Sequence, residues 1–285
     1  MSPNIAVIGP GRLGRTLALA LAARGETICA VGARTQPPEA LAVRIGGPCL
    51  ATSPEAAVEC AELVFLTVPD DAIAPLAAAL PWRAGQAVVH CSGATELAAL
   101  APAKAAGARV GGFHPLQIFS DPERALALLP GSAVALEAEE AALAAELGRL
   151  AGLLGMRPLT LQPGTRAAYH GAASFAASFL LSMLDEAAQV WGAIGLPQDL
   201  ALQALLPLAR GTLDAAEARG LAGSQAGPIS RGDAGVVAAH LKAFDALGGA
   251  HGAFYRELSR RQLTLARASG RLDEAALQRM ERLLD

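Results

Sequence analysis

The sequence predicts an α/β protein in which a Rossmann-type, doubly wound parallel sheet precedes a second, all-helical domain. In the first half of the chain, short apolar runs alternate with helical segments, as expected of parallel strands joined by crossover helices. After a Gln-Pro-Gly connection that begins at Gln162, only helical periodicity remains. A chain of 285 residues has room for about two domains. We predict them at residues 1–162 and 163–285.

Six apolar runs predict the strands of the first domain, and they cover residues 5–8, 27–31, 63–68, 87–91, 109–113 and 133–136. Between the first two runs, Leu13, Leu17 and Leu21 recur at helical spacing and form a face that can pack on the sheet. Further helices are expected after Pro37, Pro54, Asp71 and Glu96. A helix over residues 139–154 and an extended piece at 157–161 complete this domain.

The second domain is predicted to contain five helices, at residues 167–194, 198–219, 234–247, 252–268 and 273–284. The first of them has no acidic or basic residue between Ala167 and Leu184. It carries Tyr169, His170 and three serines, which a lipid-facing span rarely tolerates, so we interpret it as a core helix rather than a membrane span. A long, nearly uncharged helix needs more cover than its own chain provides, and we therefore expect a homodimer.

Composition and charge exclude several classes of protein. Lys and Arg number 23 against 26 Asp and Glu, a net charge of −3, so the chain has no cationic field to attract nucleic acid. The first apolar stretch lacks a basic leader and is interrupted by glycines and arginines, so it does not resemble a secretory signal, and we expect a cytoplasmic protein. The four cysteines form no Cys-x-x-Cys pair, so we expect reduced, packed thiols and no metal site.

A glycine-rich loop follows the first predicted strand and opens the first predicted helix. Its residues, Gly9-Pro10-Gly11-Arg12-Leu13-Gly14, satisfy the pattern G-x-G-x-x-G in the context that gives the pattern its meaning. Glycines allow the chain to turn tightly and let its backbone approach a pyrophosphate, while free amides at the helix start face the anion. We therefore predict a dinucleotide site with Gly9, Gly11, Arg12, Leu13 and Gly14 at the phosphates.

The end of the second strand indicates which dinucleotide is bound. An NAD site normally places an acid there, about 20 residues beyond the glycines, to accept hydrogen bonds from the ribose hydroxyls. This chain has Arg34 and Thr35 instead. A guanidinium forms charge-assisted hydrogen bonds with a 2′-phosphate, so we predict NADP(H) as the cofactor. The alternative is that Arg34 is only a solvated loop residue.

Polar residues follow three further strands, at the sheet edge where ligands of parallel sheets bind. Thr67, Val68 and Pro69 are expected to pass under the nicotinamide ribose. Ser92, Gly93 and Thr95 offer hydroxyls and amides to a substrate carboxylate or carbonyl.

Two histidines are the candidates for proton transfer. His114 is the first choice, because reduction of C=O or C=N requires a proton and imidazole titrates near neutrality. The alternative is that His114 only hydrogen-bonds a backbone carbonyl beside Pro115. His170 and Ser174 share one face of the following helix, which either faces substrate or is part of the helix core. His90 lies within a strand and is expected to be packed.

The turn before the third helix of the second domain combines a cation and an acid. Arg231 and Asp233 stand in a stretch that is otherwise apolar and bounded by glycines. Arg231 is a candidate for binding a substrate carboxylate, with Asp233 to orient it. Asp233 is equally well explained as a helix N-cap, and both roles are compatible.

Taken together, Gly9-Pro-Gly-Arg-Leu-Gly14, Val68-Pro-Asp-Asp71, His90-Cys-Ser-Gly93, Phe113-His-Pro-Leu-Gln117, Tyr169-His170 and Gly227-Pro-Ile-Ser-Arg-Gly-Asp233 resemble a family of bacterial two-domain oxidoreductases. Its members pair a Rossmann-like domain with a helical domain of unknown function. The chain is more distantly similar to pyrroline carboxylate reductases, and some family members resemble an alternative type of ketopantoate reductase. The resemblance covers nearly the whole chain and implies NAD(P)H-dependent reduction and a dimer formed through helical domains.

Two departures from related enzymes bear on the choice of proton donor. Family members often have Asn near the position of Ser178, which weakens the case for a polar role of this helix. The better-known ketopantoate and hydroxyisobutyrate enzymes use a lysine as donor, but the only lysines here, Lys104 and Lys242, lie in helices away from the predicted site. His114, His170 or a bound water remain.

The sequence thus predicts an NADPH-dependent reductase that acts on the C=O or C=N carbon of a small carboxylate, such as a 2-oxo acid of the ketopantoate type or a cyclic imine. The same groups would serve the reverse, oxidative direction. An alternative of another class is a non-catalytic NADP(H)-binding sensor, which would bind the nucleotide without oxidising it.

Overall fold

A computed structural model describes residues 2–285, which form two compact units. The first unit ends at Ser174 and the second runs from Phe175 to Asp285. The boundary that the sequence indicates, after Gln162, stays a prediction.

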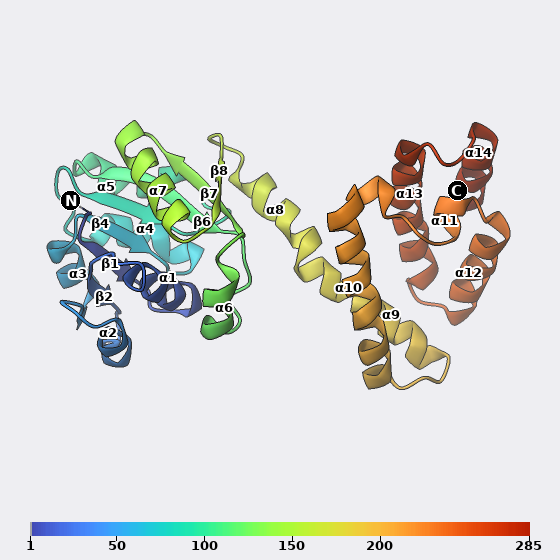
Figure 1. Cartoon of the computed structure of the whole chain (residues 1–285), viewed down its shortest axis with the longest axis horizontal. Helices are drawn as coiled ribbons and strands as arrows, with labels where there is room; N and C mark the ends of the chain where they lie inside the picture. The colour runs from blue at the N-terminus through green and yellow to red at the C-terminus, as the bar shows by residue number, and fades with distance from the viewer. Residues whose placement is uncertain (1) are drawn as a thin grey trace. The chain divides into compact units, whose positions relative to one another are not determined.

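The first unit is built on an eight-stranded sheet with the strand order β3-β2-β1-β4-β5-β6-β7-β8 (Figure 1). The strands are β1 (Ile5–Ile8), β2 (Ile28–Gly32), β3 (Leu50–Thr52), β4 (Leu63–Leu66), β5 (Ala87–His90), β6 (Arg109–Pro115), β7 (Ala133–Ala138) and β8 (Arg157–Thr160). All neighbours pair in parallel except β6 and β7, which are antiparallel. The predicted Rossmann-type fold class is therefore confirmed, with one reversed pairing that the hydrophobic pattern does not reveal.

Helices cover both faces of this sheet. They are α1 (Arg12–Ala22), α2 (Glu39–Ile45), α3 (Pro54–Cys60), α4 (Asp70–Ala79), the 3₁₀ turn η1 (Leu97–Leu100), α5 (Ala101–Ala105), α6 (Pro122–Leu128) and α7 (Ala141–Leu153). Helix α8 (Arg166–Ala176) follows β8, and Arg166 at its start is buried. Helices α1, α2 and α7 contribute to one apolar core, and α3, α4 and α5 contribute to the other. Alternate residues of β1 serve the two cores, because Ile5 and Val7 point to one face and Ala6 and Ile8 to the other. Burial on both sides explains why the strands read as continuous apolar runs.

The second unit is helical, as predicted. It contains α9 (Ser178–Ala193), α10 (Gln198–Gly223), α11 (Pro228–Arg231), α12 (Ala234–Leu247), α13 (His251–Ser269) and α14 (Glu274–Leu284). Its core gathers apolar side chains of α11 to α14, among them Ile229, Leu241, Leu263 and Met280. No residue of α9 is buried within the described part of the chain.

Several local features differ from the predictions. The sequence predicts one helix over residues 167–194, but the chain breaks at Ala177 (φ −118°, ψ −90°) into α8 and α9. Strand β3 and helix α6 were not predicted. β3 has only three residues and is partly exposed, so it lacks an apolar run, whereas α6 had a readable signal in Asp121, whose side chain accepts hydrogen bonds from the amides of Glu123 and Arg124.

A further difference concerns the candidate acid. His114 lies inside β6, which continues to Pro115, and not after the strand as the sequence suggested. The antiparallel partner β7 pairs with β6 as far as Pro115, which keeps this segment extended.

By length and composition alone, one stretch of the described residues, Arg166–Ala193, would suffice to cross a membrane. It consists of α8 and α9, and the Arg166 side chain at its start is buried in the first unit.

Candidate active site

The glycine loop between β1 and α1 has two glycines that the protein itself requires. Gly9 adopts φ +94°, and a Cβ there would lie 2.8 Å from the carbonyl oxygen of Thr67. A Cβ on Gly14 would lie 2.3 Å from the carbonyl oxygen of Gly9 and 2.3 Å from the Thr67 hydroxyl. Both positions are therefore closed to any larger residue, because backbone and a neighbouring loop fill the space.

Gly11 differs from the other two glycines of the loop. A Cβ on Gly11 would meet no atom within 4 Å, so the space above it is open. Gly11 is the N-cap of α1. Because glycine has no side chain, no side-chain oxygen accepts from the first amides of the helix, and the first turn has no acidic residue. A helix start with free amides and no carboxylate attracts anions. An anion at this helix start would lie over Gly11, next to Arg12 and Leu13, and the assignment of these three residues to the pyrophosphate stays a proposal.

Thr67, at the end of β4, holds this loop. Its hydroxyl lies 2.7 Å from the carbonyl oxygen of Gly9 and 3.0 Å from that of Ile8. The following residue, Val68, would contact any side chain at position 9. Thr67 thus shapes the nucleotide loop with its side chain.

A groove of about 640 Å³ begins at this loop and follows the ends of β1, β2 and β4. Five of the predicted cofactor residues line it, namely Gly9, Arg34, Thr35, Val68 and Pro69. Arg34 and Thr35 are exposed. Arg34 forms no ion pair or hydrogen bond with any residue that the structure describes, so its guanidinium is available to a phosphate. Arg34 and Asp71 are the charged side chains that line this groove in the described part of the chain.

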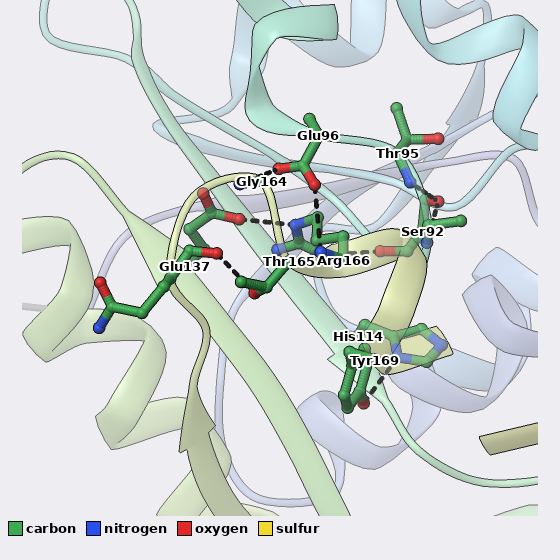
Figure 2. A network of polar contacts seen from close by, with 11 residues as sticks. Ser92, Thr95, Glu96, His114, Glu137, Gly164, Thr165, Arg166 and Tyr169 are labelled. Carbon is green, nitrogen blue, oxygen red and sulfur yellow. Dashed lines mark hydrogen bonds and ion pairs between the residues drawn. The ribbon is translucent and has the colours of Figure 1, made fainter. Parts of the chain in front are cut away.

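A cluster of aromatic polar side chains lies at the ends of β5 and β6 (Figure 2). The hydroxyl of Tyr169 lies 3.1 Å from Nδ1 of His114. His170 packs edge-on against His114, with the ring centroids 5.7 Å apart. Gly93 makes room for both histidines, because its Cβ would lie 2.8 Å from Nε2 of His114 and 2.5 Å from Cδ2 of His170. Of the residues predicted for the site, the structure brings these two histidines and Gly93 together.

The protein keeps His114 uncharged. Burial of the ring, then the neighbouring His170 and Arg166, lower the pKa of His114 to about 4, against a smaller opposite effect of Asp70. Burial likewise raises the pKa of Tyr169 above its usual value. When the Tyr169 hydroxyl donates to Nδ1, the neutral ring carries its proton on Nε2, which faces Gly93. His114 is thus arranged as a neutral hydrogen-bond donor rather than an imidazolium.

His90 is fully buried in β5, as expected, and its ring nitrogens have no hydrogen-bond partner among the described residues. Burial, and next the charge of Arg166, lower its pKa to about 4.

The hydroxyl of Ser92 is engaged in its own loop. It accepts hydrogen bonds from the amides of Ala94 (3.1 Å) and Thr95 (2.9 Å), and the Ser92 side chain is buried. The contact of Thr95 in this turn is made by its backbone, which leaves its hydroxyl out of the turn. Both bonds use the Ser92 oxygen as acceptor, so its O–H is left to donate, and its contact with a substrate carboxylate or carbonyl stays a proposal.

Arg231 and Asp233 belong to the second unit. The guanidinium Nε lies 3.0 Å from a carboxylate oxygen of Asp233, and both side chains are well exposed. Asp233 stands before α12 but makes no side-chain cap. The carboxylate thus orients the guanidinium, and the assignment of the pair to a substrate site stays a proposal.

The sequence reasoning missed a buried network that fixes the start of α8 (Figure 2). Arg166 is fully buried and donates to the carboxylate of Glu137 (2.6 Å) and to the carbonyl oxygen of Ser92 (2.8 Å). Glu96 accepts from the amides of Arg166 and Gly164, 3.1 Å in each case. A signal existed, because Glu137 ends an apolar strand and Arg166 precedes an uncharged helix, but nothing in the spacing connects them.

Two families match successive parts of the chain, and the second match begins in the sheet of the first unit, at β7. Residues 4–93 match the family described as NADP oxidoreductase, coenzyme F420-dependent. Residues 132–262 match a domain of unknown function, DUF2520. A search of curated proteins finds no match.

Solved structures share the fold over almost the whole length. A presumed NADP oxidoreductase of Bacteroides fragilis is 26% identical, with a TM-score of 0.69 over 91% of this chain and 97% of the other. A Thermotoga maritima protein has a TM-score of 0.73 at 22% identity, over 93% and 98% of the two chains. An imine reductase from a Pseudomonas species has a TM-score of 0.60 at 18% identity, over 99% and 100%.

The family matches agree with the glycine loop, with the groove beside Arg34 and with the helical second unit. The chain is therefore an NADP-dependent oxidoreductase, in which a stretch that matches NADP oxidoreductase domains precedes a stretch that matches the DUF2520 domain.

Proposed function

We propose that the protein is an NADPH-dependent reductase that converts a small carboxylate with a C=O or C=N group into the corresponding alcohol or amine. The observation that carries this proposal is that the groove lined by Arg34 and the cluster of His114, Tyr169 and His170 lie along the same edge of the sheet. The groove follows the ends of β1, β2 and β4, and His114 and Gly93 lie at the ends of the next two strands, β5 and β6. These five strands are parallel, so their ends form one edge of the sheet, where ligands of this fold bind.

NADPH supplies the hydride when it is bound. The residues of the loop position it: Gly11, Arg12 and Leu13 present the helix start to the pyrophosphate, and Arg34 and Thr35 contact the 2′-phosphate. Thr67, Val68 and Pro69 are proposed to support the nicotinamide side, with Thr67 acting through the loop that its hydroxyl holds. Because positioning of two reactants can contribute several kcal/mol to catalysis, these contacts matter as much as proton transfer.

His114 is proposed to donate a hydrogen bond from Nε2 to the oxygen or nitrogen that gains electron density during reduction, and the proton that completes the alcohol or amine comes from His170 or from water. A neutral imidazole is a suitable electrophile for this purpose, and the pKa of about 4 supports the neutral form at physiological pH. Tyr169 fixes the tautomer through Nδ1. His170 is the second candidate donor, and because it is exposed it can exchange protons with water.

For the substrate carboxylate, we propose contacts with Thr95 and the amide region of Gly93. Arg231 of the second unit, oriented by Asp233, is proposed separately as a residue that can bind a carboxylate. The exposed guanidinium of Arg231 supports this role, since it can offer further N–H groups to a second carboxylate.

The test is NADPH oxidation, followed by absorbance, with a panel of 2-oxo acids and carboxylated cyclic imines. We expect turnover with at least one of these classes. Replacement of His114 by Ala should lower kcat by about 10²-fold or more, as is typical of a lost hydrogen-bond donor to developing charge, while the Kd for NADPH stays unchanged. Tight NADPH binding with no turnover on either class would instead favour the sensor. Unchanged turnover in His114→Ala would exclude His114 as the donor.

We further propose that the enzyme is a cytoplasmic homodimer. Supporting this, α8 to α10 expose large apolar side chains, such as Phe175 (71% exposed), Leu181 (68%) and Leu208 (68%). Covering this surface with a second copy also accounts for the apolar character of Arg166–Ala193 without a membrane. Analytical ultracentrifugation should give twice the mass of the chain, and the single Leu181→Glu substitution should shift it towards the monomer. A parent protein that sediments as a monomer would contradict the proposal.

A further inference from the structure

The guanidinium of Arg166 occupies a gap in a row of three residues across the sheet. Gly112 of β6 pairs with His90 of β5 on one side and with Glu137 of β7 on the other. Neighbours in such a row point to the same face. A Cβ on Gly112 would lie 2.0 Å from Nη2 of Arg166, so the guanidinium lies where the side chain of residue 112 would be.

This placement sets the register of α8 on β6. Two residues beyond Gly112, on the same face of the strand, lies His114. Three residues beyond Arg166, on the same face of the helix, lies Tyr169, whose hydroxyl contacts Nδ1 of His114. The helix and the strand therefore meet at two successive points, with Arg166 over Gly112 and Tyr169 beside His114.

The first of these points is the more firmly held. Arg166 is fully buried and is bound by Glu137, by the carbonyl oxygen of Ser92 and, through its amide, by Glu96. The contact between Tyr169 and His114 has a single hydrogen bond at a half-buried position. A shift of α8 along β6 would break the second contact, and the hydrogen bonds of Arg166 oppose such a shift.

The charge of Arg166 also affects His114, because it favours the neutral form of the ring. Around the His114 ring stand His170 and Tyr169 from α8, Arg166 at the start of the same helix, and Asp70 from α4. After burial and His170, the charge of Arg166 is a further cause of the low pKa of His114, and it also lowers the pKa of His90.

We propose that Arg166 is a positioning residue for the reduction: it fixes α8 on β6 so that the Tyr169 hydroxyl stays on Nδ1 of His114 and Nε2 faces the reacting group. This inference rests on the proposed function, in which His114 contacts the substrate.

The decisive variant replaces the buried pair as a whole. Arg166→Met alone would leave Glu137 buried without a partner, whereas the double substitution Arg166→Met with Glu137→Met removes both charges and can preserve the fold. We expect kcat of the double variant to fall at least tenfold, while the Kd and KM for NADPH stay within twofold. We also expect the pKa of His114, followed by NMR titration of the ring without substrate, to rise, because the charge of Arg166 is one of the causes that lower it.

A second pair of variants tests the gap over Gly112. Gly112→Ala places a methyl group against Nη2 of Arg166 and should reproduce the loss of kcat. Gly148→Ala in α7 meets no atom within 4 Å and serves as the matched control with parental activity. Arg166→Lys keeps the charge but not the planar fork, and it should retain a near-parental His114 titration with a partial loss of kcat. If the double variant does not fold, Arg166→Lys and Gly112→Ala decide.

The result that would overturn the inference is parental kcat and parental His114 titration in a folded double variant. A loss of NADPH affinity parallel to the loss of kcat would also overturn it, because a general structural role predicts that pattern. A parent enzyme without reductase activity would contradict the proposed function instead, and the titration of His114 in the variants would still decide whether Arg166 controls this ring.

Discussion

Replacement of Gly11 by Ala should weaken nucleotide binding by at least two orders of magnitude without unfolding the protein. The backbone at Gly11 has φ −70° and ψ −165°, which any residue adopts, and the added methyl group meets no atom within 4 Å. Alanine is a poorer N-cap than glycine, but it also restricts the unfolded chain, and the two effects offset each other to within about 1 kcal/mol. The melting temperature should therefore change by only a few degrees.

The effect on binding is much larger, because the methyl group occupies the space that we assign to the pyrophosphate. Hydrogen bonds to a charged group contribute roughly 1.5–3 kcal/mol each. Loss of two such bonds from the amides at the start of α1 amounts to about 3–6 kcal/mol, which corresponds to about 10²- to 10⁴-fold in Kd.

Isothermal titration calorimetry with NADPH, together with thermal unfolding, measures both effects. Gly152→Ala in α7, which also meets no atom within 4 Å, is the matched control and should bind NADPH as the parent does. Gly14→Ala should behave in the opposite way to Gly11→Ala and lower stability, since its Cβ would lie 2.3 Å from the Gly9 carbonyl oxygen. Parental affinity in Gly11→Ala would refute the placement of the pyrophosphate over this residue.

Three further predictions follow from the groove and the buried histidines. Arg34→Ala should weaken NADPH binding by about 10- to 100-fold and leave NADH binding unchanged, as measured by calorimetry; equal losses for both nucleotides would argue against a 2′-phosphate contact. Tyr169→Phe should lower kcat at least tenfold with an unchanged Kd for NADPH, and parental kcat would exclude a role for its hydroxyl. The free energy of unfolding should fall as the pH drops from 6.5 towards 4. In this range His90 and His114 are protonated in the unfolded chain but stay neutral in the folded protein. For the fully buried His90, the lowering of the pKa from 6.5 to about 4 corresponds to roughly 3 kcal/mol of unfolding free energy. The unfolding free energy of His90→Leu, measured with urea, should therefore depend less on pH than that of the parent. An unchanged pH dependence would contradict the low pKa of His90.

Local signals in the sequence were sufficient for most of the fold. The apolar runs of β1, β4 and β5 are visible because these strands are buried on both faces, and the glycine loop is visible because Gly9 and Gly14 admit no other residue. The direction of β7 could not be predicted, since parallel and antiparallel strands have the same apolar pattern when both faces are covered. The helix break at Ala177 could not be predicted either, because no glycine or proline stands next to it.

The candidate site was only partly predictable for a related reason. His114 and Gly93 could be singled out because each follows or ends an apolar run, and the sheet edge brings such residues together. The contact of Tyr169 with His114, and the buried network of Arg166, depend on how α8 lies on β6. The position of α8 along β6 is set by side chains far apart in the sequence, so it cannot be predicted from the spacing of residues.

The hydroxyl of Thr67 bridges the carbonyl oxygens of Ile8 and Gly9 by contacts within this one chain. The nucleotide loop therefore already has its binding shape in the free enzyme. The conformational entropy of the loop is lost when the protein folds, and little more is lost when the nucleotide binds. Association should consequently follow simple one-step kinetics, with hydrogen-exchange protection at the loop before any dinucleotide is added.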